Sequence, residues 1–102
     1  MGPIERCIAD KLDEALSPVE LQVINESAMH NVPPDSETHF KIIVVSELFS
    51  KKRMVQRHQT IYKLLAQELD GPVHALAIHT FSPSEWKAKN STTPTSPKCL
   101  GG

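Results

Sequence analysis

The chain has 102 residues, of which 39% are hydrophobic and 23% are charged, and its formal net charge at pH 7 is −1. This length suits one domain with a hydrophobic core of its own. The near-zero charge gives no general electrostatic attraction to nucleic acid or to anionic membranes, and no apolar run approaches the ~20 residues of a membrane-spanning helix.

The first predicted element is an amphipathic helix that begins at Gly2-Pro3, because proline suits the first position of a helix. Its apolar residues recur at helical spacing: Ile4, Ile8, Leu12, Ala15 and Leu16. Ser17-Pro18 ends it, since proline disfavours helix in the residue before it. Alternation over Val19–Asn25 then predicts a half-buried strand with Val19 on its apolar side.

The middle of the chain predicts a long loop followed by a central strand. Residues 26–38 are polar and proline-containing, and loops of this length in compact domains are often functional. His39–Ser46 is apolar on both faces, which favours a strand at the centre of a sheet. A turn is expected around Leu48-Phe49-Ser50.

A second helix is predicted over Lys51–Leu69, ended by Asp70-Gly71-Pro72. Its expected buried stripe is Met54, His58, Ile61, Leu65 and Leu69. A third strand follows over Val73–Thr80, and Ser82-Pro83-Ser84-Glu85 predicts the start of a short last helix with a capping box. Residues 1–89 therefore form the predicted domain, and the Ser/Thr/Pro-rich residues 90–102 a flexible tail.

This order, α-β-β-α-β-α, predicts a single α+β domain. The first two strands are expected to pair antiparallel. The second helix serves as a right-handed crossover, so that the third strand runs parallel to the second. The result is a three-stranded mixed sheet backed by helices.

The topology brings three histidines to one rim of that sheet. His30 in the loop, His39 at the start of the second strand and His74 at the start of the third share this end, whereas His79 lies further along its strand and His58 is expected in the core. Each of the three also has a purely structural interpretation. His30 would be an ordinary loop residue, His39 a cap at the start of its strand, and His74 a partner for nearby backbone groups. Together they indicate half of a metal site that ligands from another molecule would complete.

The cysteines give no metal or disulfide pattern of their own. Cys7 and Cys99 lie at opposite ends of the chain and no C-x-x-C occurs, which argues against a disulfide framework and favours a reducing compartment. The N-terminal residues show no signal-peptide or Arg-rich transit pattern. Cys99, in the predicted tail, is an alternative ligand at the rim. No nucleophile–base or paired-carboxylate constellation points to an enzyme.

Several separated motifs, in order, make the chain resemble the BolA family. They are Asn31-Val32-Pro33-Pro34, Ser36-Glu37-Thr38-His39-Phe40, Arg57-His58, Gly71-Pro72-Val73-His74-Ala75-Leu76, Ser82-Pro83-Ser84-Glu85-Trp86 and the tail Ser96-Pro97-Lys98-Cys99. The resemblance implies a fold similar to the type II KH domain, a monomeric isolated chain and pairing with a monothiol (CGFS-type) glutaredoxin.

The same resemblance implies a shared [2Fe–2S] cluster, and hence a role in iron–sulfur cluster assembly or trafficking and in redox homeostasis. The glutaredoxin side would give a cysteine and a bound glutathione thiol, and this chain would give His74 with His30 from the loop, His39 being a possible accessory at the rim. Imidazole in place of thiolate raises the cluster potential and makes binding depend on pH. The mitochondrial branch is the most similar, which predicts a mitochondrial location, with the cytoplasm as the alternative.

Nucleic-acid binding is the alternative function, because bacterial relatives are linked to transcriptional control. Lys51, Lys52, Arg53 and Arg57 form a local basic patch that could contact nucleic acid. A solvated helix end explains the same residues. KH domains clamp the nucleic-acid backbone with a G-x-x-G loop, and this sequence has none.

Overall fold

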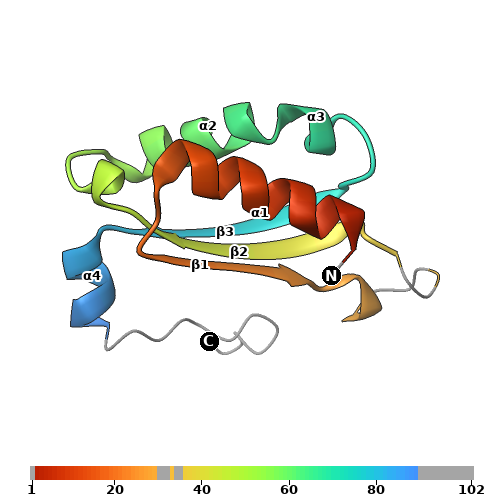
Figure 1. Cartoon of the computed structure of the whole chain (residues 1–102), viewed down its shortest axis with the longest axis horizontal. Helices are drawn as coiled ribbons and strands as arrows, with labels where there is room; N and C mark the ends of the chain where they lie inside the picture. Colours follow the sequence, from red (N-terminus) through yellow and green to blue (C-terminus); the bar gives the residue numbers. More distant parts are fainter. Residues whose placement is uncertain (1, 30–32, 34–35, 90–102) are drawn as a thin grey trace.

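The computed structural model describes residues 2–29, 33 and 36–89, in which three helices form a layer on one face of a sheet and a fourth, short helix follows the last strand outside this layer (Figure 1). The sheet strands are β1 (Glu20–Asn25), β2 (His39–Val45) and β3 (Ala75–Phe81). The helices are α1 (Pro3–Leu16), α2 (Met54–Leu64), α3 (Ala66–Leu69) and α4 (Pro83–Ala88), with 3-10 turns η1 (Ser27–Met29) and η2 (Glu47–Phe49). None of these helices is long and apolar enough to cross a membrane.

The sheet has the predicted topology, with strand order β1-β2-β3. β1 pairs antiparallel with β2, and β2 pairs parallel with β3. This arrangement confirms the expected α+β class with a three-stranded mixed sheet. It also confirms that β2 is central, which explains why it carries apolar side chains on both faces.

The core lies between the helices and the face of β2 that carries Phe40, Ile42 and Val44, each at most 1% exposed. Ile8 and Leu12 of α1 reach it from one helix, and Ile61, Leu65 and Val73 from the segment that follows η2. Apolar residues at helical spacing thus meet apolar residues at strand spacing, which is the physical basis of the two layers.

The prediction of one helix over Lys51–Leu69 is wrong in its start and in its continuity. α2 begins at Met54, and Leu65, with φ −105° and ψ 19°, separates it from α3. The buried face is also rotated from the predicted stripe: Met54 is 54% exposed, His58 is half-buried, and Arg57 is only 3% exposed. A count of apolar residues misses this face because a charged side chain occupies its centre.

The strand limits also differ from those expected. Val19 is 66% exposed and precedes β1, so it does not belong to the apolar side of that strand. β3 starts at Ala75 rather than Val73, because the Val73 amide donates to the Glu68 carbonyl and closes the end of the helix instead. Lys41, 8% exposed on the sheet face away from the helices, is a buried charge that the pattern did not indicate.

The last helix follows its predicted signals. The Ser82 hydroxyl accepts from the Glu85 amide (3.2 Å), and the Glu85 carboxylate accepts from the Ser82 amide (2.8 Å). This reciprocal pair is the expected capping box. Trp86 anchors the helix on Phe81, with ring centroids 5.2 Å apart. The predicted tail, residues 90–102, lies outside the described residues.

Candidate metal centre

His39 and His74 lie together at one end of the sheet. His39 is the first residue of β2, and His74 immediately precedes β3. Because the two strands are parallel, their starts meet at the same edge. The imidazole ring centroids are 6.3 Å apart with an interplanar angle of 74°. The predicted convergence is confirmed for this pair, whereas His30, the third member, lies outside the described residues.

Thr38 ties the two histidines to each other through its backbone and its side chain. Its carbonyl accepts from the amides of His74 (2.8 Å) and Ala75 (3.2 Å). Its hydroxyl lies 2.8 Å from Nδ1 of His39. One residue therefore sets the start of β3 and orients the His39 ring, so the pair is held by the fold rather than by chance contact on the surface.

The ends of the long loop are also fixed at this rim. The Ser27 hydroxyl accepts from the amides of Thr38 (2.9 Å) and His39 (3.1 Å). The Asn25 side chain donates to the Ser36 carbonyl (2.9 Å). Sequence reasoning missed these contacts, since a serine in a polar loop carries no periodic signal.

Glu37 is a second residue that the sequence analysis missed. Its carboxylate accepts from the amides of Ile4 (3.2 Å) and Glu5 (3.0 Å) at the start of α1. A carboxylate stabilises a helix N-terminus because it pairs unsatisfied amides and opposes the helix dipole. The residue two positions before His39 is thereby fastened to α1, and with it the strand start that carries the candidate ligand.

The rim supplies imidazole nitrogens and has an exposed side. His74 is solvent-exposed and His39 is half-buried. Among the described residues, no group of three or more His, Cys, Asp or Glu could hold a metal ion. Two imidazoles are fewer than the four ligands of a closed structural site. A metal bound here would need ligands from outside this group, and the exposed His74 is accessible to another molecule.

The remaining predicted site residues are not part of the rim. Arg57 is buried and forms an ion pair with Glu85, so it is not an exposed side chain that could contact nucleic acid. The prediction that Arg57 belongs to the basic patch is therefore corrected. Lys51, Lys52 and Arg53 are exposed as expected. Cys99, the alternative ligand, lies outside the described residues.

Cys7 forms a separate cluster between α1 and α3. Its thiol donates to the Glu68 carboxylate (3.2 Å), which also forms an ion pair with Lys11 (2.8 Å). The hydrogen bond to Glu68 and burial raise the pKa of Cys7. Burial opposes the charge of Glu68, but hydrogen bonds from Lys11 and Cys7 outweigh it and lower the pKa of that carboxyl. The thiol therefore stays protonated, which is unlike a metal ligand or nucleophile.

Glu68→Gln is expected to speed alkylation of Cys7 several-fold at pH 8. The substitution removes the carboxylate that raises the thiol pKa and leaves the Lys11 cation, which lowers it. The rate is measured with iodoacetamide and peptide mass spectrometry, which separates Cys7 from Cys99. Equal rates for Cys7 in the wild type and the variant would contradict this account of the thiol.

The chain is similar to proteins of one family along nearly its whole length. A family model described as BolA-like protein matches residues 12–85. Human BolA-like protein 1 is 53% identical over 102 residues, covering 100% of this chain and 74% of the human protein. The DNA-binding transcriptional regulator BolA of Vibrio cholerae is 52% identical over 99 residues, covering 97% of this chain and 93% of that protein.

Solved structures agree with the sequence comparison. The solution structure of BolA1 from Mus musculus superimposes with a TM-score of 0.84 and 48% identity, covering 99% of this chain and 81% of the mouse chain. The BolA domain of SufE1 from Arabidopsis thaliana gives a TM-score of 0.77 and 42% identity, covering 83% of this chain and 98% of that domain.

Proposed function

Since the chain belongs to the BolA family, we propose that it is a non-catalytic adaptor in iron–sulfur cluster assembly or trafficking. In this proposal it binds a monothiol glutaredoxin and contributes ligands to a [2Fe–2S] cluster held between the two proteins. The observation that carries the proposal is the pair of imidazoles at the start of β2 and β3, with ring centroids 6.3 Å apart. The proposed compartment is the mitochondrion, which rests on resemblance alone.

The chemistry of the donor set suits a shared centre. His74 is the proposed principal ligand because it is exposed where another protein can approach, and its backbone is fixed by Thr38. His30 is the proposed second ligand. It follows Ser27 by three residues, a span of at most about 11 Å along the chain, and Ser27 bonds directly to the start of β2.

His39 has an accessory role in this proposal. Its ring packs edge-on against His74, and Thr38 fixes its orientation through Nδ1. A neighbouring ring of this kind can help to set the orientation of a ligand ring. When bound, the cluster would supply redox and cluster-transfer chemistry, and this chain would supply orientation, imidazole ligands and their dependence on pH.

His74→Ala is expected to abolish the visible circular-dichroism signature of the cluster when the chain is mixed with a cluster-loaded monothiol glutaredoxin. His30→Ala is expected to weaken cluster binding less, because a loop side chain is less preorganised than one fixed at a strand start. His79→Gln, further along β3, serves as the control that removes an imidazole away from the rim.

Two readouts separate the parts of the proposal. The spectrum reports the ligands, and sedimentation of the mixed apo-proteins reports whether the two chains associate at all. If both histidine variants give the wild-type spectrum, the ligand assignment is wrong even where association persists. If no glutaredoxin binds with or without a cluster, the adaptor function itself fails.

DNA binding is a second candidate function, favoured by one observation: a bacterial relative 52% identical to this chain is named a DNA-binding transcriptional regulator. The exposed Lys51, Lys52 and Arg53 would provide phosphate contacts. Against it stand a net charge of −1 and the burial of Arg57. Affinity for duplex DNA that falls steeply with salt would support this candidate.

A further inference from the structure

The segment from η2 to the start of α2 presents apolar side chains to solvent at the end of the sheet opposite the histidine rim (Figure 1). Six large hydrophobic side chains are exposed among the described residues, and three of them, between 53% and 63% exposed, lie in this segment: Leu48, Met54 and Val55. We call these three residues the apolar tip. Val19, also exposed, lies at the same end, because its amide donates to the Val45 carbonyl (2.8 Å) just before η2. Exposed apolar groups that gather in one place, rather than scatter, mark a contact surface.

Hydrogen bonds and core packing hold this segment in place. The Ser46 hydroxyl donates to the Leu16 carbonyl (2.7 Å) and accepts from the Leu48 amide (3.2 Å). Phe49 is fully buried, and the Arg57 guanidinium donates to the Lys52 carbonyl (3.0 Å). The contacts that turn Phe49 inward therefore leave Leu48 facing outward. A surface fixed in this way loses little conformational entropy when it binds a partner.

Three consecutive cations lie between the apolar residues. They are all exposed, and we call them the basic run: Lys51, Lys52 and Arg53. Residues 48–58 contain four basic side chains and no Asp or Glu, although the whole chain has a net charge of −1. The nearest acid before them, Glu47, accepts a hydrogen bond from the Ser50 hydroxyl (3.0 Å). A local excess of one sign of charge attracts opposite charge even on a nearly neutral protein.

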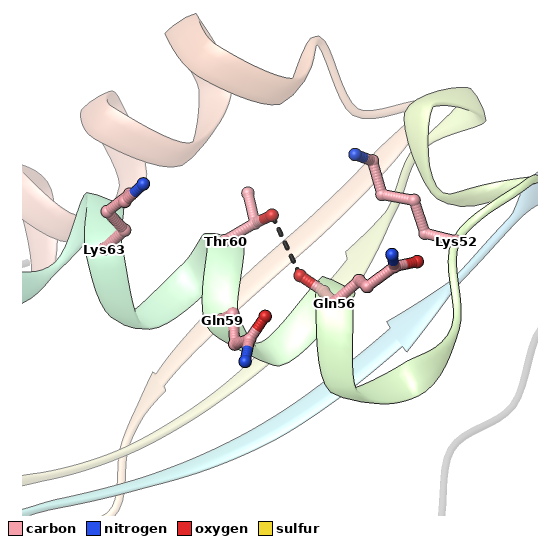
Figure 2. Close-up of a pocket in the computed structure, with 5 residues that line it drawn as sticks. All are labelled: Lys52, Gln56, Gln59, Thr60 and Lys63. Atoms are coloured by element: carbon pink, nitrogen blue, oxygen red, sulfur yellow. Dashed lines mark hydrogen bonds between the residues drawn. The ribbon is translucent and has the colours of Figure 1, made fainter.

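The apolar tip has a polar boundary along α2. A groove of about 230 Å³ follows the helix, lined only by polar and basic side chains: Lys52, Gln56, Gln59, Thr60 and Lys63. Figure 2 shows Lys52 at the start of this row, on the segment that leads into the helix. The exposed aliphatic residues are thus few and are bordered by polar groups. This pattern suits shallow insertion into an interface rather than burial against a large apolar surface.

We propose that this end of the domain binds the surface of an anionic phospholipid bilayer. The apolar tip enters the boundary between headgroups and acyl chains, and the basic run lies at the level of the anionic headgroups. Aliphatic side chains gain free energy by leaving water, and each Lys or Arg near an anionic leaflet adds attraction. Phosphate contacts with nucleic acid would account for the basic run but would give the apolar tip no partner. This surface goes beyond the cluster adaptor function and uses none of its proposed ligands.

The test is co-sedimentation of the full chain with sucrose-loaded vesicles of phosphatidylcholine, either alone or with about 30% phosphatidylglycerol. The chain is expected to bind the anionic vesicles at least about 10-fold more tightly than the neutral ones. Lys51→Gln/Lys52→Gln should weaken this binding about 20-fold, because two headgroup attractions are lost. Leu48→Ser/Val55→Ser, which leaves the charge unchanged, should weaken it about 10-fold through lost apolar burial.

Ile24→Thr/Tyr62→Ser is the matched control, because it removes two exposed apolar side chains outside the apolar tip. It should change vesicle binding less than about 2-fold. Thermal unfolding checks that each variant is folded. The proposal is overturned if the wild type does not prefer anionic vesicles, or if Leu48→Ser/Val55→Ser binds them no more weakly than the control. Binding to duplex DNA without binding to either vesicle would assign the basic run to nucleic acid and would also overturn it.

Discussion

Arg57→Ala is expected to lower the free energy of unfolding by about 3 kcal/mol, because it removes a buried cation that joins three elements. The Arg57 guanidinium donates to both carboxylate oxygens of Glu85 on α4, at 2.7 and 3.1 Å. It also donates to the carbonyls of Lys52 (3.0 Å) and Thr80 (3.4 Å), before α2 and on β3. Truncation leaves these carbonyls unpaired and opens a cavity.

Thermal or urea unfolding followed by circular dichroism measures this effect. For a domain of this size, 3 kcal/mol corresponds to a decrease in Tm of roughly 12–24 °C. Arg53→Ala is the matched control, since Arg53 is exposed and its substitution should cost less than about 0.5 kcal/mol. Arg57→Lys should recover only part of the loss, because an ammonium group cannot form the paired bonds to Glu85. Equal stability of the Arg57→Ala and Arg53→Ala variants would contradict the structural role of Arg57.

The ion pair also predicts a dependence on pH. Arg57 and the capping bond from Ser82 lower the pKa of Glu85. The pair therefore contributes its full stability above the ordinary glutamate pKa of about 4.3 and loses it as pH falls through the lowered value. Because the Glu85 side chain is 44% exposed, solvent screening keeps this contribution modest.

Periodicity alone could not have identified Arg57. The sequence predicted the sheet order, the core face of β2 and the cap of α4 because each depends on local spacing. The burial of Arg57 depends on Glu85, 28 residues later, and on carbonyls from two other elements. The predicted stripe therefore included Met54, which is 54% exposed, and the half-buried His58, and it left out Arg57.

The candidate site likewise has features that the sequence predicts and features that it does not. The convergence of His39 and His74 followed from topology, because parallel strands start at one edge and the two histidines lie at the starts of β2 and β3. The contacts that fix the rim, from Ser27, Glu37 and Thr38, could not be predicted, since polar loop residues have no periodicity and their partners lie up to 33 residues away. Sequence thus predicts where the candidate ligands lie more readily than what holds them there.

The turn before α2 and the histidine rim lie at opposite ends of the sheet, because β2 starts at the rim and ends before that turn (Figure 1). Arg57 and the turn before α2 fix the first end, and Thr38 with the loop anchors fixes the second. Substitutions at one end are therefore expected to leave the chemistry of the other intact, as is usual for sites that share no partners.

Phe49→Ala is expected to destabilise the domain by about 3–5 kcal/mol, the range for truncation of a buried aromatic residue. Phe49 lies in η2, where the sequence indicated only a turn, yet it is 0% exposed and belongs to the main core. The Arg57 guanidinium lies 5.7 Å from the centre of its ring, so the substitution also removes a cation–π contact.

Leu48→Ala is a closely matched control for Phe49→Ala. Leu48 is the preceding residue of η2 and is 53% exposed, so its truncation should cost less than about 1 kcal/mol. The two variants are compared by urea denaturation, and their free energies of unfolding are calculated with one shared m-value, the slope of free energy against urea concentration. The double variant Phe49→Ala/Arg57→Ala should lose less than the sum of the single losses, because the two side chains share one contact. Similar costs at Leu48 and Phe49 would show that η2 is a surface turn. Strict additivity in the double variant would show that Arg57 packs independently of Phe49.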